Sequence, residues 1–199
     1  MIFLPRPETF SSSTGELWRS FFWRIPALLL VLFLLGEGDF RLFRPRKGDL
    51  AVLGISFPGL CFTGFLTALA AALTGLVPGK DLSAPAGLHS WIRVIAGSLS
   101  AGYLEETYFR VYLLRRLPGL FQGKTAEHVF SRENLGRIPF PVLLFAFCHI
   151  YEGPWGFVNA LLAGVFLSLV YIKTSSLHGI ALAHGLYNIT VYLRAALEL

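Results

Sequence analysis

The chain reads Leu104-Glu105-Glu106-Thr107-Tyr108-Phe109-Arg110 near its middle, so that two adjacent carboxylates and a guanidinium lie inside an otherwise apolar stretch. In a helix, Glu106 and Arg110 are four residues apart and share one face, with the acid first, which favours an ion pair. Glu105 is rotated by about 100° from that pair and is left for another partner. On a water-exposed helix this spacing is an ordinary solvated charge pair, but an ionisable side chain at membrane depth costs about 2.5–3.5 kcal/mol to insert. The apolar surroundings therefore make Glu105 a candidate functional residue that faces the interior of a helix bundle.

The composition is typical of an integral membrane protein. Of the 199 residues, 54% are hydrophobic and 15% are charged, and the mean hydropathy is +0.61, outside the usual range of soluble domains. The net charge of +5 comes from Lys and Arg in loops between apolar runs, which indicates membrane orientation and not nucleic-acid binding. Cys61 and Cys148 lie in apolar runs, where we expect small buried side chains and no disulfide.

The apolar runs predict an all-α fold, a polytopic membrane bundle of about six helices. The predicted helices are bounded by Gly, Pro or charged residues and cover 21–35, 50–77, 87–117, 139–150, 156–172 and 177–197. The run 139–150 is short, so we expect a partial or tilted span. We divide the chain into 1–86, a tail with two spanning helices, and 87–199, a helical catalytic core.

Loop charges predict the orientation in the membrane. With six spans, the loops at 36–49 and 110–138 and Lys173 lie on one side and carry eleven basic residues, whereas the other side carries four. Basic residues concentrate in cytoplasmic loops. We therefore expect the 110–138 loop in the cytoplasm and both termini outside.

Three later polar residues are predicted to lie near Glu105. His149 ends the fourth apolar run, and His184 and Asn188 are spaced four apart on one face of the sixth, as are Phe145 and His149 in the fourth. At about 1.5 Å per residue, all four polar residues come to lie about 12–18 Å below the same, cytoplasmic, face. A single intramembrane His or Asn is usually a link between helices, worth about 0.6 kcal/mol. Four at one depth are better explained by a polar pocket.

This set of groups suits peptide hydrolysis without a covalent intermediate. A buried Glu105 can take a proton from water near neutral pH, and His149 can share that water. His184 and Asn188 can donate hydrogen bonds to the oxyanion of a tetrahedral intermediate, worth about 3–4 kcal/mol per donor.

Three ordered motifs make the sequence similar to a known family. Glu105-Glu106-Thr107-Tyr108-Phe109-Arg110 fits Glu-Glu-x-x-x-Arg, Phe145-Ala146-Phe147-Cys148-His149 fits Phe-x-x-x-His, and His184-Gly185-Leu186-Tyr187-Asn188 fits His-x-x-x-Asn. In this the chain resembles the CPBP or ABI family of intramembrane proteases, which includes the eukaryotic CAAX prenyl endopeptidase, over about residues 93–193.

The resemblance implies an ABI-type catalytic core and a role for each matched residue. It implies Glu105 as general base, His149 as its partner on the water, and His184 and Asn188 as oxyanion donors. Supporting roles fall to Glu106, Arg110 and Phe145. The implied partners are membrane lipid and a protein or peptide with a membrane-associated C-terminus. The small size and the richness in Leu, Arg, Gly and Pro indicate a prokaryotic role, the processing of C-terminal sorting tails in the inner membrane of a bacterium, where the substrate need not be prenylated.

Cofactor and function each keep an alternative. Members of the family have been described both as metalloproteases and as metal-independent glutamate proteases. Zinc, if bound, would use Glu105, His149 and His184 as ligands. Because the chain has no His-Glu-x-x-His pair, we expect no tightly bound metal. The alternative to an enzyme is a non-catalytic immunity or scaffold protein of the same fold. A transporter or proton relay would usually show paired repeats with broken helices, which this sequence lacks.

Overall fold

The computed structural model describes residues 27, 29, 33, 43–75, 84–116 and 132–197, and in these ranges every regular element is a helix. The all-α prediction is therefore confirmed for the described part of the chain. The predicted tail, most of the predicted first span at 21–35 and the loop up to residue 131 lie outside the described residues.

The helices follow the apolar runs of the sequence. In chain order they are α2 (Asp49–Thr74), α3 (Gly87–Glu106), the π-helix η3 (Thr107–Arg116), α5 (Arg132–Arg137), α6 (Pro139–Cys148), the 3-10 helix η4 (Ile150–Glu152), α7 (Gly153–Thr174) and α8 (Leu177–Ala196). The helices α2, α6, α7 and α8, together with α3 continued by η3, correspond to the second to sixth predicted spans. The short helix α5 was not predicted, because its six residues carry no apolar period.

A count of six spans is not confirmed. Among the described residues, two helices are long and apolar enough to cross a membrane, namely Asp49–Thr74 and Ile150–Thr174. The ten residues of α6 are too few, because a span needs about 20. The polar residues of α3 and α8, which include those of the candidate site, lower the hydropathy of these two helices.

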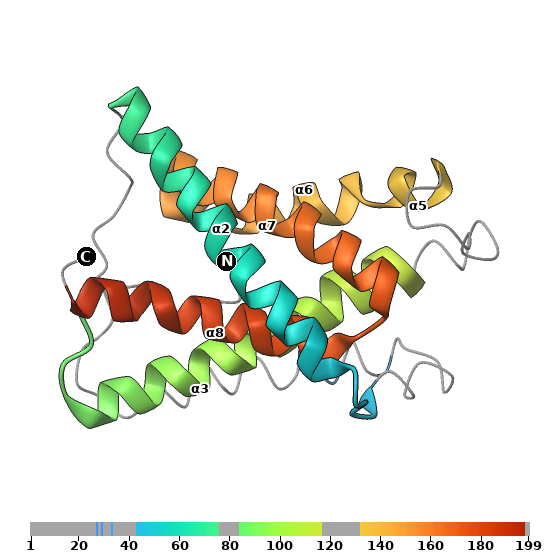
Figure 1. The fold of residues 1–199 in the computed structure, drawn as a ribbon, viewed down its shortest axis with the longest axis horizontal. Coiled ribbons are helices and arrows are strands. Elements are labelled where there is room, and N and C mark those ends of the chain that lie inside the picture. Colours follow the sequence, from blue (N-terminus) through green and yellow to red (C-terminus); the bar gives the residue numbers. More distant parts are fainter. Residues whose placement is uncertain are drawn as a thin grey trace.

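The helices pack in an order that places α8 at the centre of the contacts. The helix α8 packs against both α3 and α2, and α6 packs against α7 (Figure 1). The helices α3 and α8 run side by side in opposite directions, while α2 crosses α7 and α8. The residues of α2 therefore cover the core that α3, α6, α7 and α8 form.

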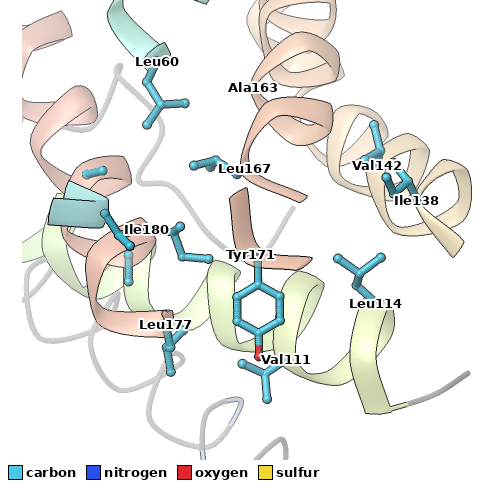
Figure 2. Packing of buried hydrophobic residues seen from close by; sticks show 13 residues of the cluster. Leu60, Val111, Leu114, Ile138, Val142, Ala163, Leu167, Tyr171, Leu177 and Ile180 are labelled. Carbon is cyan, nitrogen blue, oxygen red and sulfur yellow. The ribbon is translucent and has the colours of Figure 1, made fainter. Parts of the chain in front are cut away.

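One buried apolar cluster joins η3, α6, α7 and α8 with α2 (Figure 2). Leu167 and Tyr171 of α7 are fully buried in it, together with Leu60 of α2. The sticks in Figure 2 show Val111 and Leu114 of η3 on one side of Tyr171. This packing fixes the end of η3, and so the helix that carries Glu105, against the rest of the bundle.

A close approach of two helices lies beside the Glu-Glu pair. A Cβ added to Gly102 of α3 would lie 2.5 Å from the backbone oxygen of Ala181 and 2.9 Å from the backbone nitrogen of Gly185, both in α8. Small residues at helix crossings let membrane helices approach backbone to backbone. Because Gly102 is one turn before Glu105 and Gly185 directly follows His184, this crossing brings the polar residues of the two helices together.

The hydrogen-bonding pattern of the helix that carries Glu105 and Glu106 changes directly after them. The α-helical pattern of α3 ends at Glu106, and the same helix continues as η3 with π-helical hydrogen bonding. At the junction, the Thr107 hydroxyl donates to the backbone oxygen of Tyr103 at 2.7 Å. Threonine back-bonding of this kind competes with the helical ladder, and π-helical turns are frequent at functional sites.

The prediction that both cysteines are buried is wrong for Cys61. Both thiols are free, as expected, but Cys61 is exposed on α2 and Cys148 is half-buried. The reason is that an apolar helix in a membrane bundle carries apolar residues on its outward face as well, so that hydropathy alone does not tell the two faces apart.

Candidate active site

Glu105 and Glu106 occupy the last turn of α3, and both are buried, with 1% and 0% of their surface exposed. Being adjacent, they point in different directions from the helix. Glu106 makes direct contacts with a guanidinium and an imidazole, whereas neither Glu105 oxygen has a hydrogen-bond partner among the described residues. The two carboxylates therefore differ in role, because Glu106 is paired within the protein and Glu105 is left for another partner.

Glu106 is the centre of a charged network. The predicted pair with Arg110 is present, with 3.1 Å between Arg110 Nε and Glu106 Oε2. The other oxygen, Oε1, lies 2.8 Å from His184 Nδ1, a contact that the sequence did not predict because the two residues are 78 positions apart. Since a carboxylate accepts, His184 Nδ1 donates. Glu106 thus orients the His184 ring and fixes which nitrogen faces the site.

Arg110 and Phe145 hold the side chains of this network in place. The guanidinium lies over the Phe145 ring at 4.7 Å from its centroid, and its Nη2 donates to the backbone oxygen of Gly164 at 3.4 Å. The Phe145 ring also meets His184 edge-on at 5.9 Å and lies 4.5 Å from the His149 ring. One aromatic ring therefore contacts the guanidinium and both imidazoles, which gives the predicted supporting residue Phe145 a physical role.

His149 stands at the end of the short helix α6. It is the C-cap residue, and its Nδ1 lies 2.8 Å from the backbone oxygen of Phe145. The carbonyl can only accept, so Nδ1 carries the hydrogen, and in the neutral ring Nε2 has the lone pair. The end of α6, well short of a full span, thus places the imidazole inside the bundle.

Both imidazoles turn Nε2 toward Glu105. The distance to Glu105 Oε2 is 3.9 Å from His149 and 3.8 Å from His184. These distances exceed a direct hydrogen bond, but one water molecule between the groups can bridge them. The structure therefore brings together three of the four predicted catalytic residues around one buried carboxylate oxygen.

Asn188, the fourth predicted residue, follows His184 by one turn of α8 and is half-buried. Its spacing puts it on the same helix face as His184. No hydrogen bond of its amide to another described residue is present. Its role as an oxyanion donor therefore stays a prediction.

A comparison with known families agrees with this arrangement. The profile of the type II CAAX prenyl endopeptidase Rce1-like family matches residues 87–190, more than half of the chain. The chain belongs to this family. A search of the curated proteins and one of the solved structures found no match.

Membership of the Rce1-like family indicates the class of enzyme and a membrane location. The family is one of CAAX endopeptidases and of membrane proteins, which agrees with the two apolar helices that are long enough to span. The match begins at Gly87, the first residue of α3, and ends within α8. It therefore contains Glu105, His149, His184 and Asn188, while α2 lies outside it.

Zinc is the metal that the residues of the Rce1-like site would hold if one were bound. A zinc ion holds nitrogen and oxygen ligands at about 2.0–2.2 Å in tetrahedral geometry. Within residues 43–75, 84–116 and 132–197, no group of three or more His, Cys, Asp or Glu side chains is arranged to hold a metal ion. The expectation of no tightly bound metal therefore stays a prediction, and no step below uses a metal.

The sequence reasoning missed residues on both sides of the site. Tyr103 on α3 donates its hydroxyl to His178 Nδ1 at 3.0 Å, because His178 Nε2 donates to the backbone oxygen of Phe43 at 3.0 Å. Tyr151 and Glu152 lie two and three residues after His149, in η4. The sequence signal for Glu152 is its charge, because an acidic residue three positions after His149 stands out between apolar runs.

Proposed function

We propose that the protein is an intramembrane endopeptidase that cleaves near the C-terminus of membrane-associated proteins or peptides, using water activated by Glu105. The observation that carries the proposal is the buried Glu105 carboxylate, whose Oε2 faces the Nε2 atoms of His149 and His184 at 3.9 and 3.8 Å. A buried carboxylate without a direct partner is costly and is usually kept for function. A water molecule held there can donate one hydrogen to Glu105 and the other to His149 Nε2.

The first step is addition of this water to the scissile carbonyl. Glu105 takes the proton as the oxygen attacks, so that the carboxylate becomes a carboxylic acid and the carbonyl oxygen becomes an oxyanion. His149 positions the water through its Nε2 lone pair, because its Nδ1–H is held by the backbone oxygen of Phe145. No covalent intermediate with the protein is formed.

The oxyanion needs hydrogen-bond donors placed where its charge develops. His184 Nδ1–H is already held by Glu106, so Nε2 can donate only when the ring is doubly protonated. In that form Glu106 still accepts from Nδ1–H. The Asn188 amide, one turn further along α8, is proposed as the second donor, and each donor is expected to lower the barrier by about 3–4 kcal/mol.

Collapse of the intermediate completes the reaction. The Glu105 carboxylic acid returns its proton to the leaving nitrogen as the carbon–nitrogen bond breaks, which restores the carboxylate and releases an amine and a carboxylic acid. Glu106, Arg110 and Phe145 do not exchange protons in this scheme. They hold His184 and His149 in place.

For the cellular setting we propose the inner membrane of a bacterium, with the site open to the cytoplasm and sorting tails as substrates. The start of α2, the end of η3 and the α7–α8 connection lie at one end of the bundle (Figure 1). At this end Ser176 donates to Asp49 Oδ1 at 2.5 Å. Of the eleven basic residues that the sequence assigns to this side, Arg110 is buried in the site, and the other ten support a cytoplasmic location for these ends.

The proposal is tested by comparing cells that carry the parent protein with cells that carry Glu105→Gln. Mass spectrometry of membrane proteins should find C-terminal cleavages in the parent that disappear in the variant, while both proteins reach the membrane in equal amount. Glu37→Gln, outside the family match, is the matched control and should keep the cleavages. If Glu105→Gln cleaves as well as the parent, Glu105 is not the base; if no cleavage depends on the protein at all, the non-catalytic immunity or scaffold function is favoured.

A further inference from the structure

Tyr151 and Glu152 form a second polar pair directly beside His149. They belong to the 3-10 turn η4, and the Glu152 backbone N–H donates to the backbone oxygen of His149 at 3.0 Å. The Tyr151 ring stacks on the His149 ring with centroids 6.3 Å apart and planes 24° apart. The pair is therefore built on the same short turn that carries a proposed catalytic residue.

The Glu152 carboxylate is held in place on this turn. Tyr151 donates its hydroxyl to Glu152 Oε1 at 3.2 Å. The side chain folds over Gly156, where an added Cβ would lie 2.3 Å from Glu152 Cβ and 3.1 Å from Oε2. A glycine at this position leaves the space that the carboxylate needs.

One oxygen of this carboxylate is left for a ligand. Glu152 is half-buried, and its Oε2 has no hydrogen-bond partner within the described residues, while Tyr151 is 39% exposed. Tyr151, which holds the carboxylate, stacks on the ring of His149. The carboxylate therefore lies at the edge of the site, with an accessible oxygen and an aromatic side chain next to it.

We infer that Tyr151 and Glu152 form a specificity subsite that takes a Lys or Arg side chain of the substrate close to the scissile bond. The inference rests on the proposed peptidase function and names its substrate class. A carboxylate oxygen pairs with an ammonium or guanidinium through charge-assisted hydrogen bonds, and a tyrosine ring adds attraction for a cation. In the scheme above Glu152 handles no proton, and Glu106, not Glu152, pairs with Arg110, so Glu152 is free to select the substrate.

A peptide library tests this in proteoliposomes that contain the full protein. The probes are membrane-anchored peptides, with or without a farnesylated cysteine, whose residues flanking the scissile bond are randomised; cleaved products are identified by mass spectrometry. The variants are Glu152→Gln, which keeps the shape, Glu152→Arg, which reverses the charge, and Tyr151→Phe, which removes only the hydroxyl. Tyr112→Phe is the control for loss of a tyrosine hydroxyl, because Tyr112 belongs to η3 and stacks on Tyr108.

The parent is expected to prefer Lys or Arg over Gln at one flanking position about tenfold or more. Glu152→Gln should abolish that preference while neutral peptides are still cleaved, Glu152→Arg should shift it toward Asp and Glu, and Tyr151→Phe should weaken it. Tyr112→Phe should keep the parent's preference. A preference that survives Glu152→Gln, or a variant that slows all peptides alike, overturns the inference. Cleavage by the parent without any charge preference also overturns the proposed subsite, but it leaves the proposed peptidase function intact. Loss of cleavage in Glu105→Gln alone supports the peptidase function separately.

Discussion

Replacement of Gly102 by alanine should push α3 and α8 apart beside the site. The added Cβ would lie 2.5 Å from the backbone oxygen of Ala181, whereas ordinary contacts of a Cβ begin at 3.4 Å. Neither this oxygen nor the backbone nitrogen of Gly185 can move as a flexible side chain could. The two helices must therefore separate by up to about 0.9 Å, the difference between the two distances.

That separation acts directly on the hydrogen bond between Glu106 and His184. Its length of 2.8 Å would increase to as much as about 3.7 Å, beyond a hydrogen bond. Overpacking costs about 1–3 kcal/mol, and a hydrogen bond to a charged group contributes about 1.5–3 kcal/mol. When the helices move apart, the overpacking is relieved but the hydrogen bond is weakened, so the two costs do not add fully. We expect a loss of about 2–3 kcal/mol in the free energy of unfolding.

Two measurements check this prediction. Unfolding of purified protein in mixed detergent micelles should report the lower stability, and cleavage of substrate should fall about tenfold or more, since 1.4 kcal/mol in the barrier corresponds to a factor of ten. Gly54→Ala is the matched control, because no atom lies within 4 Å of an added Cβ at this position of α2. If Gly102→Ala and Gly54→Ala have the same stability and activity, the close crossing does not hold the site together.

The other predictions concern the ion pair, the orientation and the metal. Glu106→Ala should lower the yield of folded protein by leaving Arg110 buried and unpaired, a cost of about 3–5 kcal/mol, whereas Glu105→Ala should insert normally; equal yields of the two would contradict this. A cysteine introduced at Gly123 should react with a membrane-impermeant thiol reagent only from the cytoplasmic side and one at Ser12 only from outside, and labelling of both from one side would mean an even number of spans between them. Activity should survive exhaustive chelation; one equivalent of bound zinc, with activity restored by zinc after chelation, would refute the metal-free mechanism.

The sequence was sufficient where the interaction is local. The pair Glu106–Arg110 was predicted from its spacing and is present at 3.1 Å, because residues four apart meet on any helix. The apolar runs likewise predicted α2, α7 and α8 to within a few residues at most ends, since helices in a membrane bundle must be long and apolar.

The sequence was insufficient where helix ends and hydrogen-bonding patterns depend on packing. The change from α3 to the π-helix η3 and the short helix α5 have no hydropathy signal of their own. The exposure of Cys61 was also predicted wrongly, because outward and inward faces of an apolar helix have the same composition. These features follow from contacts between helices and from which side of α2 faces away from the bundle.

What the sequence determined by itself is therefore the class of protein and the identity of its polar residues, namely a membrane bundle with Glu105, His149, His184 and Asn188 in three ordered motifs. Only the tertiary structure decided how they meet. The close crossing at Gly102 brings His184 to Glu106, and the early end of α6 places the His149 Nε2 within 3.9 Å of Glu105 Oε2. The physical reason is that helical spacing fixes which residues share a face, whereas the distance between two faces depends on the side chains, or their absence, where the helices cross.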